Sequence, residues 1–133
     1  MFVGEYQSAL GIPKNRVSLP TKIYSLLTNR QVVLSKGFDR CIVGYEVKAW
    51  EQSVESYLHM PTKDAEARRL RRFIFANATI VPFDKQGRAV IPPFLAEYGG
   101  LSKEIVIVGL GDHFEMWDKS RWEQESKQLN KGI

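Results

Sequence analysis

Cysteine is nearly absent from this sequence, since Cys41 is the single one among 133 residues. One cysteine cannot form a disulfide within the chain, and it excludes zinc sites that are built from several thiolates. Chains without disulfides are typical of reducing compartments, so we expect a cytoplasmic protein.

Long apolar runs are also missing. The longest stretches, such as residues 105–108, fall far short of the roughly 18 apolar residues that a membrane span requires. Residues 1–6 lack the basic segment and the long apolar segment of a signal peptide. We therefore expect no membrane association.

Motifs of catalysis and cofactor binding are scarce. A phosphate-binding loop is absent, and Gly109-Leu110-Gly111 lacks the third glycine of a dinucleotide fingerprint. His59 and His113 are far apart and have no partner at a metal-ligand spacing. We interpret His113 as a solvent-facing strand residue and Cys41 as a small, half-buried one. We thus expect no enzyme, no metal, no cofactor and no small-molecule substrate.

What the chain does have is an ordinary globular composition. It is 44% hydrophobic and 26% charged, with a mass of 15.2 kDa, which suits one domain. Lys plus Arg number 19 against 15 for Asp plus Glu, giving a net charge of +4. This excess permits nucleic-acid binding without requiring it.

The sequence is an internal duplication with one constant offset, the offset that brings Arg16 onto Arg88. The triplet Trp50-Glu51-Gln52 recurs at 122–124, and the other matches keep the same offset. These are Leu19/Ile91, Pro20/Pro92, Ile23/Leu95, Val33/Ile105, Leu34/Val106, Gly37/Gly109 and Tyr45/Trp117. A unit of roughly 45 residues is too small to bury a core alone. We therefore predict two repeats, over residues 5–50 and 77–120, that intertwine as one structural domain.

Both repeats predict the same order of elements: a short strand ended by proline, a short helix, a hairpin and a closing helix. The predicted strands are 17–19, 32–34, 41–45, 77–83, 89–91, 105–108 and 113–117, and the predicted helices are 21–27, 47–58, 63–75, 93–98 and 119–129. A linking segment, 62–75, begins with Thr62 as N-cap, and a C-terminal helix and tail occupy 121–133. Trp50 and Trp122 are expected to anchor the closing helices to the barrel. Strands that close on themselves leave no exposed edge, so we predict an α+β fold with a mainly β core.

Two polar turns at equivalent places are the candidate functional site. Their candidate DNA-binding residues are Lys14, Asn15, Arg16, Lys85, Gln86 and Arg88. Arg and Lys neutralise phosphates, Arg can bind guanine edges, and Asn and Gln can bind adenine edges. The alternative is structural, because Asp84 stands four residues before Arg88 and can pair with it to fix the turn.

The strongest cationic run lies in the linking helix and comprises Arg68, Arg69, Arg71 and Arg72. We favour a solvated helix face in which these arginines pair with Asp64 and Glu66. A supporting phosphate patch, or an interface with an acidic neighbour, remains the alternative.

Several segments carry a specific likeness to a known family: 1–6, 16–20, 73–76, 84–88, 91–92 and 108–118. They resemble MraZ, a family of bacterial transcriptional regulators with two tandem AbrB-like (SpoVT-AbrB) domains. The resemblance covers nearly the whole chain. It implies a pseudo-symmetric double swapped-hairpin β-barrel with flanking helices, and subunits that associate into homo-oligomeric rings. It also implies binding to repeated short G-rich boxes upstream of the division and cell-wall gene cluster.

The hallmark of that family is an Asp-x-x-x-Arg motif in each half. Asp84 and Arg88 match it in the second half. In the first half the repeat offset brings Ile12, preceded by Gly11, to the place of the acid. Either the acid is lost or the turn carries an insertion, which affects the pairing within the turn more than it affects Arg16.

These observations predict a cytoplasmic, nucleoid-associated regulator that binds double-stranded promoter DNA, including its own promoter, and copies of itself. Two alternatives stay open: an antitoxin-like autoregulator that mainly binds another protein, and a sequence-blind architectural protein of the nucleoid. The ratio of affinities for a specific promoter and for random duplex separates them.

Overall fold

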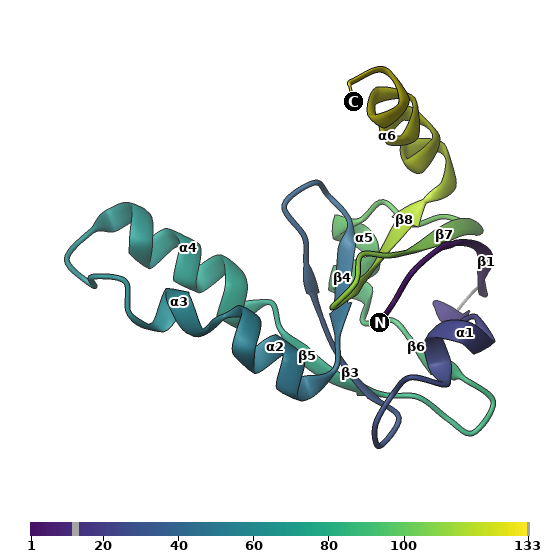
Figure 1. Cartoon of the computed structure of the whole chain (residues 1–133), viewed down its shortest axis with the longest axis horizontal. Coiled ribbons are helices and arrows are strands. Elements are labelled where there is room, and N and C mark those ends of the chain that lie inside the picture. Colours follow the sequence, from purple (N-terminus) through teal and green to yellow (C-terminus); the bar gives the residue numbers. More distant parts are fainter. Residues whose placement is uncertain (12–13, 133) are drawn as a thin grey trace.

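The structure is a computed structural model and describes residues 1–11 and 14–132 (Figure 1). Its strands are β1 (Glu5–Gly11), β2 (Arg16–Ser18), β3 (Gln31–Lys36), β4 (Ile42–Tyr45), β5 (Thr79–Pro82), β6 (Arg88–Val90), β7 (Glu104–Gly109) and β8 (Phe114–Asp118). Its helices are α1 (Thr21–Tyr24), α2 (Val47–Ser53), α3 (Glu55–Leu58), α4 (Ala65–Ala76), α5 (Pro93–Tyr98) and α6 (Lys119–Gly132). Within the described residues, none of these helices has the length and apolarity to cross a membrane.

The strands form one antiparallel sheet in the order β5-β3-β4-β8-β7-β1-β2-β6, which is nearly closed into a barrel. The hairpin of each repeat pairs with the first strand of the other repeat: β3 pairs with β5, and β7 pairs with β1. The registers are equivalent, because Val33 faces Ile80 and their counterparts at the repeat offset, Ile105 and Ser8, also face each other. This exchange of hairpins is a double swapped-hairpin barrel, and the predicted fold class is confirmed.

Two ladders lie on the pseudo-two-fold axis that relates the repeats. Val43 of β4 faces Glu115 of β8, and Val17 of β2 faces Ala89 of β6, and each pair joins a residue to its own counterpart in the other repeat. Equivalent residues can face each other only where the axis passes between them. In the sheet order these two ladders are four strands apart, so the axis crosses opposite walls of the barrel.

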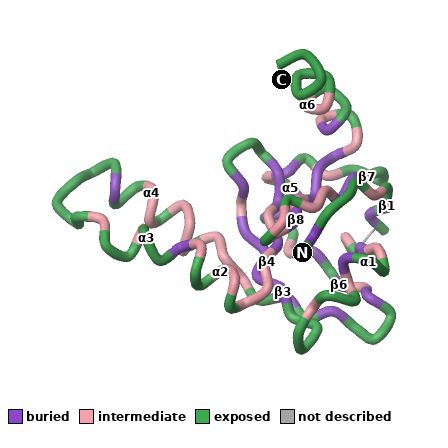
Figure 2. The backbone as a smooth tube through the Cα atoms, viewed as in Figure 1, coloured by how far each residue is buried: buried purple, intermediate pink, exposed green. Residues whose placement is uncertain are grey.

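Both repeats contribute to one hydrophobic core inside the barrel (Figure 2). Its fully buried side chains include Val17, Ile23, Leu34 and Ile42 from the first repeat and Ile91, Leu95, Ile105, Ile107, Phe114 and Met116 from the second. Since neither repeat encloses this core by itself, the repeats depend on each other for burial of apolar surface.

Helices α2, α3 and α4 form an arm that extends away from the barrel (Figure 1). Phe73 of α4 stacks on Phe38 in the β3–β4 turn, with ring centroids 5.5 Å apart. Trp50 of α2 meets Phe75 of α4 edge-on at 5.7 Å, whereas Trp122 of α6 is buried 5.6 Å from the ring of Trp117 in β8. The predicted anchoring to the barrel is therefore confirmed for Trp122, while the aromatic partner of Trp50 belongs to another helix.

Several predicted boundaries were wrong. No strand was predicted over β1, and the single helix predicted over residues 47–58 is interrupted at Val54, between α2 and α3. The predicted helix 21–27 ends at Tyr24. The linking helix is capped by Asp64, whose carboxylate accepts the N–H of Glu66 at 3.1 Å, and not by Thr62.

Two side chains are also more buried than the sequence indicated. Cys41, predicted as half-buried, is completely buried. His113, predicted as solvent-facing, lies just before β8 and keeps only 17% of its side-chain exposure. Its ring stacks on Tyr45, with centroids 4.5 Å apart.

Candidate nucleic-acid interface

β2 and β6 form a two-stranded ribbon on the pseudo-two-fold axis. Arg16 faces Val90 across the ladder, and Arg88 faces Ser18. Successive side chains of a strand point to opposite faces, and Val17 and Ala89 are the buried ones. Both arginines therefore lie on the outer face of the ribbon, about 7 Å apart along the strand direction.

The two turns that precede these strands share a left-handed residue at the equivalent position, directly before the arginine. Asn15 has φ of 53° and its counterpart Gly87 has φ of 77°. Both angles fall in the left-handed region, which Gly and Asn enter at the lowest cost. Each turn is also fastened to the other repeat, because the N–H of Leu19 donates to Gly87 O at 2.8 Å and the N–H of Ile91 donates to Asn15 O at 2.9 Å.

Asp84 organises the second turn. Its Oδ1 accepts the backbone N–H groups of Gln86 and Arg88, each at 2.9 Å, and its Oδ2 lies 3.4 Å from Arg88 Nε. The hydrogen bond from the Arg88 backbone is the largest cause that lowers the pKa of Asp84 below its ordinary value. The pairing that the sequence offered as a structural role for Arg88 is thus present.

The Arg88 side chain is held from a second direction, since its guanidinium donates to the amide oxygen of Gln86. It still keeps 42% of its exposure, so a ligand on the outer face can reach it. Tyr24 of α1 supports the same turn: its hydroxyl donates to Asp84 O at 2.7 Å, and its ring lies against Gly87. The duplication gives no signal for Tyr24, because its equivalent in the second repeat is Ala96.

The first turn presents its cations more openly. Lys14 and Arg16 are exposed, and Asn15 is half-buried. In the part of the chain that the structure describes, no carboxylate forms an ion pair with Arg16. Ile12 lies outside the described residues, as does Pro13, so the departure at Gly11-Ile12 stays a prediction.

The ribbon and its turns together carry four cationic side chains and one carboxylate: Lys14, Arg16, Lys85, Arg88 and Asp84. A two-stranded ribbon fits the major groove of B-form DNA, where Arg can bind guanine edges. Lysines beside it can neutralise phosphates.

The basic run of the linking helix does not join this surface. Its arginines lie on the α4 arm, away from β6 (Figure 1). Arg68 donates to Thr62 O at 2.9 Å, and Arg69 pairs with Glu66 at 3.3 Å between exposed side chains. The expected pairing is confirmed for Glu66, whereas Asp64 caps the helix through its carboxylate.

Comparison with known proteins identifies the family. The family model described as "MraZ protein, putative antitoxin-like" matches residues 1–73 and, a second time, residues 74–132. The chain belongs to the MraZ family. That one MraZ model matches each half separately agrees with the equivalent ladder registers of the two repeats.

Curated relatives extend this match over the whole chain. A protein of Acetivibrio thermocellus named transcriptional regulator MraZ is 40% identical over 130 residues, which cover 98% of this chain and 90% of the relative. Its namesake in Clostridium beijerinckii is 40% identical over 124 residues, covering 93% and 86%. The MraZ regulator of Dictyoglomus thermophilum is also 40% identical, over 130 residues that cover 98% and 88%.

Proposed function

We propose that this MraZ chain is a sequence-specific DNA-binding transcriptional regulator. The names of its relatives support the regulatory role. The observation that carries the proposal is the β2–β6 ribbon, whose outer face presents Arg16 and Arg88 between two cationic turns. It combines a shape suited to the major groove with the charge that DNA backbones attract.

The two arginines have different roles in this proposal. Arg88 is held by Asp84 and Gln86, so its guanidinium loses little conformational entropy when it binds a guanine edge. Arg16 has no recorded ion pair among the described residues and can reach either a base or a phosphate. Lys14 and Lys85 then neutralise phosphates, and Asn15 and Gln86 border the same groove.

The resemblance extends the proposal to the target and the assembly. We propose a homo-oligomeric ring that binds repeated short G-rich boxes upstream of the division and cell-wall gene cluster, its own promoter included. Such a protein acts in the cytoplasm, on the nucleoid. The arginines of α4 lie outside the ribbon surface and have at most a supporting role.

Fluorescence anisotropy tests the proposal. The protein is titrated onto a duplex from its own promoter and onto a shuffled duplex of equal composition, at several salt concentrations. We expect an affinity ratio of about 10³ or more for the promoter at physiological salt. A ratio near one would favour the architectural alternative. Absent DNA binding together with tight association to another protein would favour the antitoxin-like one.

Point variants test the placement of the surface. Arg16→Ala and Arg88→Ala are each expected to weaken binding by about 1–3 kcal/mol. Lys127→Ala on α6 removes one positive charge outside the ribbon and is the matched control. Arg72→Ala tests the basic run of α4, and we expect little change in DNA affinity from either variant. Wild-type affinity in a folded Arg16→Ala, Arg88→Ala double variant would show that the ribbon is not the DNA surface.

A further inference from the structure

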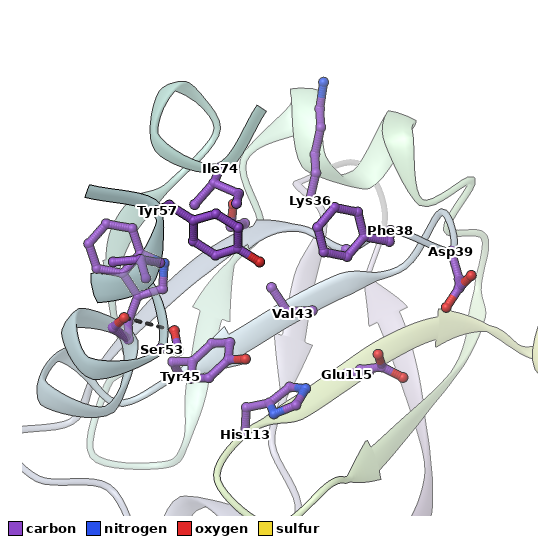
Figure 3. Close-up of a pocket in the computed structure, with 14 residues that line it drawn as sticks. Lys36, Phe38, Asp39, Val43, Tyr45, Ser53, Tyr57, Ile74, His113 and Glu115 are labelled. Carbon is purple, nitrogen blue, oxygen red and sulfur yellow. Dashed lines mark hydrogen bonds between the residues drawn. The ribbon is translucent and has the colours of Figure 1, made fainter. Parts of the chain in front are cut away.

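A pocket of about 190 Å³ lies where the axis crosses the wall opposite the ribbon. It is bordered by the β3–β4 hairpin, the α2–α4 arm and the start of β8, and it is partly open (Figure 3). Its walls include Val43, Tyr45, Trp50, Tyr57, His113 and Glu115. None of these residues has a part in the proposed DNA contacts.

The duplication provides an internal comparison for this pocket. Tyr45, His113 and Glu115 correspond, at the repeat offset, to Trp117, Cys41 and Val43. Those counterparts pack into an apolar cluster together with Val106, Val108 and Trp122. The side chains at this place are therefore apolar around one hairpin, whereas around the other they include a histidine, a tyrosine and a carboxylate that line the hollow. The side chains differ although the backbone ladders of the two repeats are equivalent, and Tyr57 and Ile74 of the α2–α4 arm also line the hollow.

The polar groups in the pocket wall are held in place. His113 Nδ1 lies 2.7 Å from Asp112 Oδ1, and its ring is stacked within 9° of parallel on Tyr45. Glu115 Oε1 accepts the indole N–H of Trp117 at 2.9 Å. Figure 3 shows the hydroxyl ends of Tyr45 and Tyr57 directed toward the same space beside Val43. Fixed polar groups beside aromatic and apolar side chains are characteristic of small-molecule sites.

The charges in the wall favour a positively charged ligand. Two carboxylates, Asp39 and Glu115, belong to the lining. Lys36 also lines the pocket, but its chain leads away from the cavity, and its Nζ lies 5.0 Å from the ring centroid of Tyr98 (Figure 3). Aromatic faces attract cations as well, through their quadrupole.

We propose that this pocket binds a small organic cation, a primary amine or a guanidinium on a short carbon chain. The charged end meets Glu115, and the chain lies between the aromatic rings and Val43. The small volume limits the ligand to a few carbon atoms, since drug-sized ligands occupy about 300–1,000 Å³. The proposal does not depend on DNA binding.

Isothermal titration calorimetry with putrescine and agmatine tests the site, with butyrate as the anionic control. We expect saturable binding of an amine with a stoichiometry of one per chain, and none of butyrate. Glu115→Gln keeps an acceptor for Trp117 while it removes the charge, so affinity is expected to fall roughly 10-fold or more. Glu123→Gln, an exposed carboxylate on α6, is the matched control and is expected to bind like the parent.

A filling variant keeps the test decisive if Glu115→Gln perturbs the fold. His113→Cys with Tyr45→Trp introduces the residues that already pack around the other hairpin, and it is expected to abolish binding while the protein stays folded. Absence of amine binding in the parent protein would overturn the proposal. So would equal binding by the parent and the filling variant, or equal affinity for butyrate.

Discussion

At the residue scale, positions 15 and 87 show how the two turns tolerate different side chains. Both have positive φ, and a Cβ at Gly87 would meet the Tyr24 ring at 3.3 Å. We expect Gly87→Ala to lower the free energy of unfolding by about 1–2 kcal/mol, because the left-handed backbone strains an L-residue. Asn15→Gly introduces no such strain, so we expect it to change the free energy of unfolding by no more than about 0.5 kcal/mol. Urea unfolding at fixed protein concentration measures both; an equal cost would contradict the assigned backbone conformations.

The carboxylate of Asp84 makes a second residue-scale prediction, on pH. Hydrogen bonds from the Arg88 and Gln86 backbones, with the Arg88 charge, lower its pKa from the ordinary value of 3.8. A carboxyl whose pKa is lower in the folded than in the unfolded chain stabilises the fold at any pH above its unfolded-state pKa. That stabilisation is lost as the pH falls through its folded-state pKa. The difference in melting temperature between the parent and Asp84→Asn should therefore be constant near neutral pH and shrink below about pH 4. The control is Glu123→Gln, and a difference that grows in acid would contradict the assignment.

Sequence reasoning could find the candidate residues of the interface and the pairing of Asp84 with Arg88, but not the contact of Tyr24 with the second turn. The repeat offset makes Arg16 and Arg88 equivalent, and both do lie on the outer face of the ribbon. Their bonding differs because Asp84 and Tyr24 hold the second turn, and the described residues of the first turn show no such contacts. Tyr24 reaches Asp84 across 60 residues of sequence, and such a contact leaves no local pattern to detect.

At the element scale, most of the predicted strands have a β-branched run or a proline at the end, and β8 was predicted from the alternation of Phe114 and Met116. β2, β3, β6 and β7 have these signals. β1, with the sequence EYQSALG, has small and polar residues, and its ladder to β7 comes from the exchange between repeats. The break at Val54 was missed too, because the apolar spacing of residues 47–58 suits one helix.

The start of α6 carries a prediction at this scale. Buried Asp118 accepts hydrogen bonds from Ser102 Oγ at 2.6 Å and Ser120 Oγ at 2.7 Å, joining the loop before β7 to the helix. Burial alone would raise the pKa of Asp118, but these hydrogen bonds outweigh it and lower the pKa. We expect Asp118→Ala to cost about 1–2 kcal/mol of stability.

Glu46 is the matched comparison, because it stands at the equivalent position before α2. It accepts one backbone N–H, that of Thr28, at 2.6 Å, and it is less buried than Asp118. Glu46→Ala is therefore expected to cost less, about 0.5–1 kcal/mol. Urea unfolding measures the stability of the two variants. A larger loss of stability in Glu46→Ala than in Asp118→Ala would contradict the larger contribution assigned to Asp118.

At the scale of the whole molecule, the pseudo-two-fold axis separates two surfaces. The ribbon lies on one wall of the barrel and the proposed cation pocket on the other. Each of the two surfaces departs from the two-fold symmetry. Asp84 braces the second turn, whereas among the described residues no carboxylate pairs with Arg16 of the first, and His113 and Glu115 line the pocket whereas their counterparts, Cys41 and Val43, belong to an apolar cluster. A single chain thus presents two related but unequal arginines, which suits a short box without internal symmetry.

One chain offers few base contacts, each worth about 1–3 kcal/mol, which is too little to select one promoter in a genome. In the proposed ring, neighbouring subunits engage successive boxes, provided that these recur about every 10 base pairs, one helical turn. Linked sites can then raise avidity by about 10²–10⁴. We expect light scattering at micromolar protein to give a mass that is a multiple of the 15.2 kDa chain. A monomer across all concentrations would exclude the ring and the avidity with it.

Arg88→Ala in every subunit should then cost far more on a three-box duplex than on a one-box duplex, because the same contact is lost at each box. Its salt dependence identifies the target of the guanidinium. If the slope of log affinity against log salt concentration falls by about one per box, Arg88 contacts a phosphate. If the slope is unchanged and the sequence preference is relaxed, Arg88 contacts guanine. Since Asp84 and Gln86 already hold Arg88 in place, we expect the second result. Anisotropy with one-box and three-box duplexes at several salt concentrations measures both quantities. An oligomeric Arg88→Ala protein that binds both duplexes like its parent would leave Arg88 with the role of fixing the turn alone.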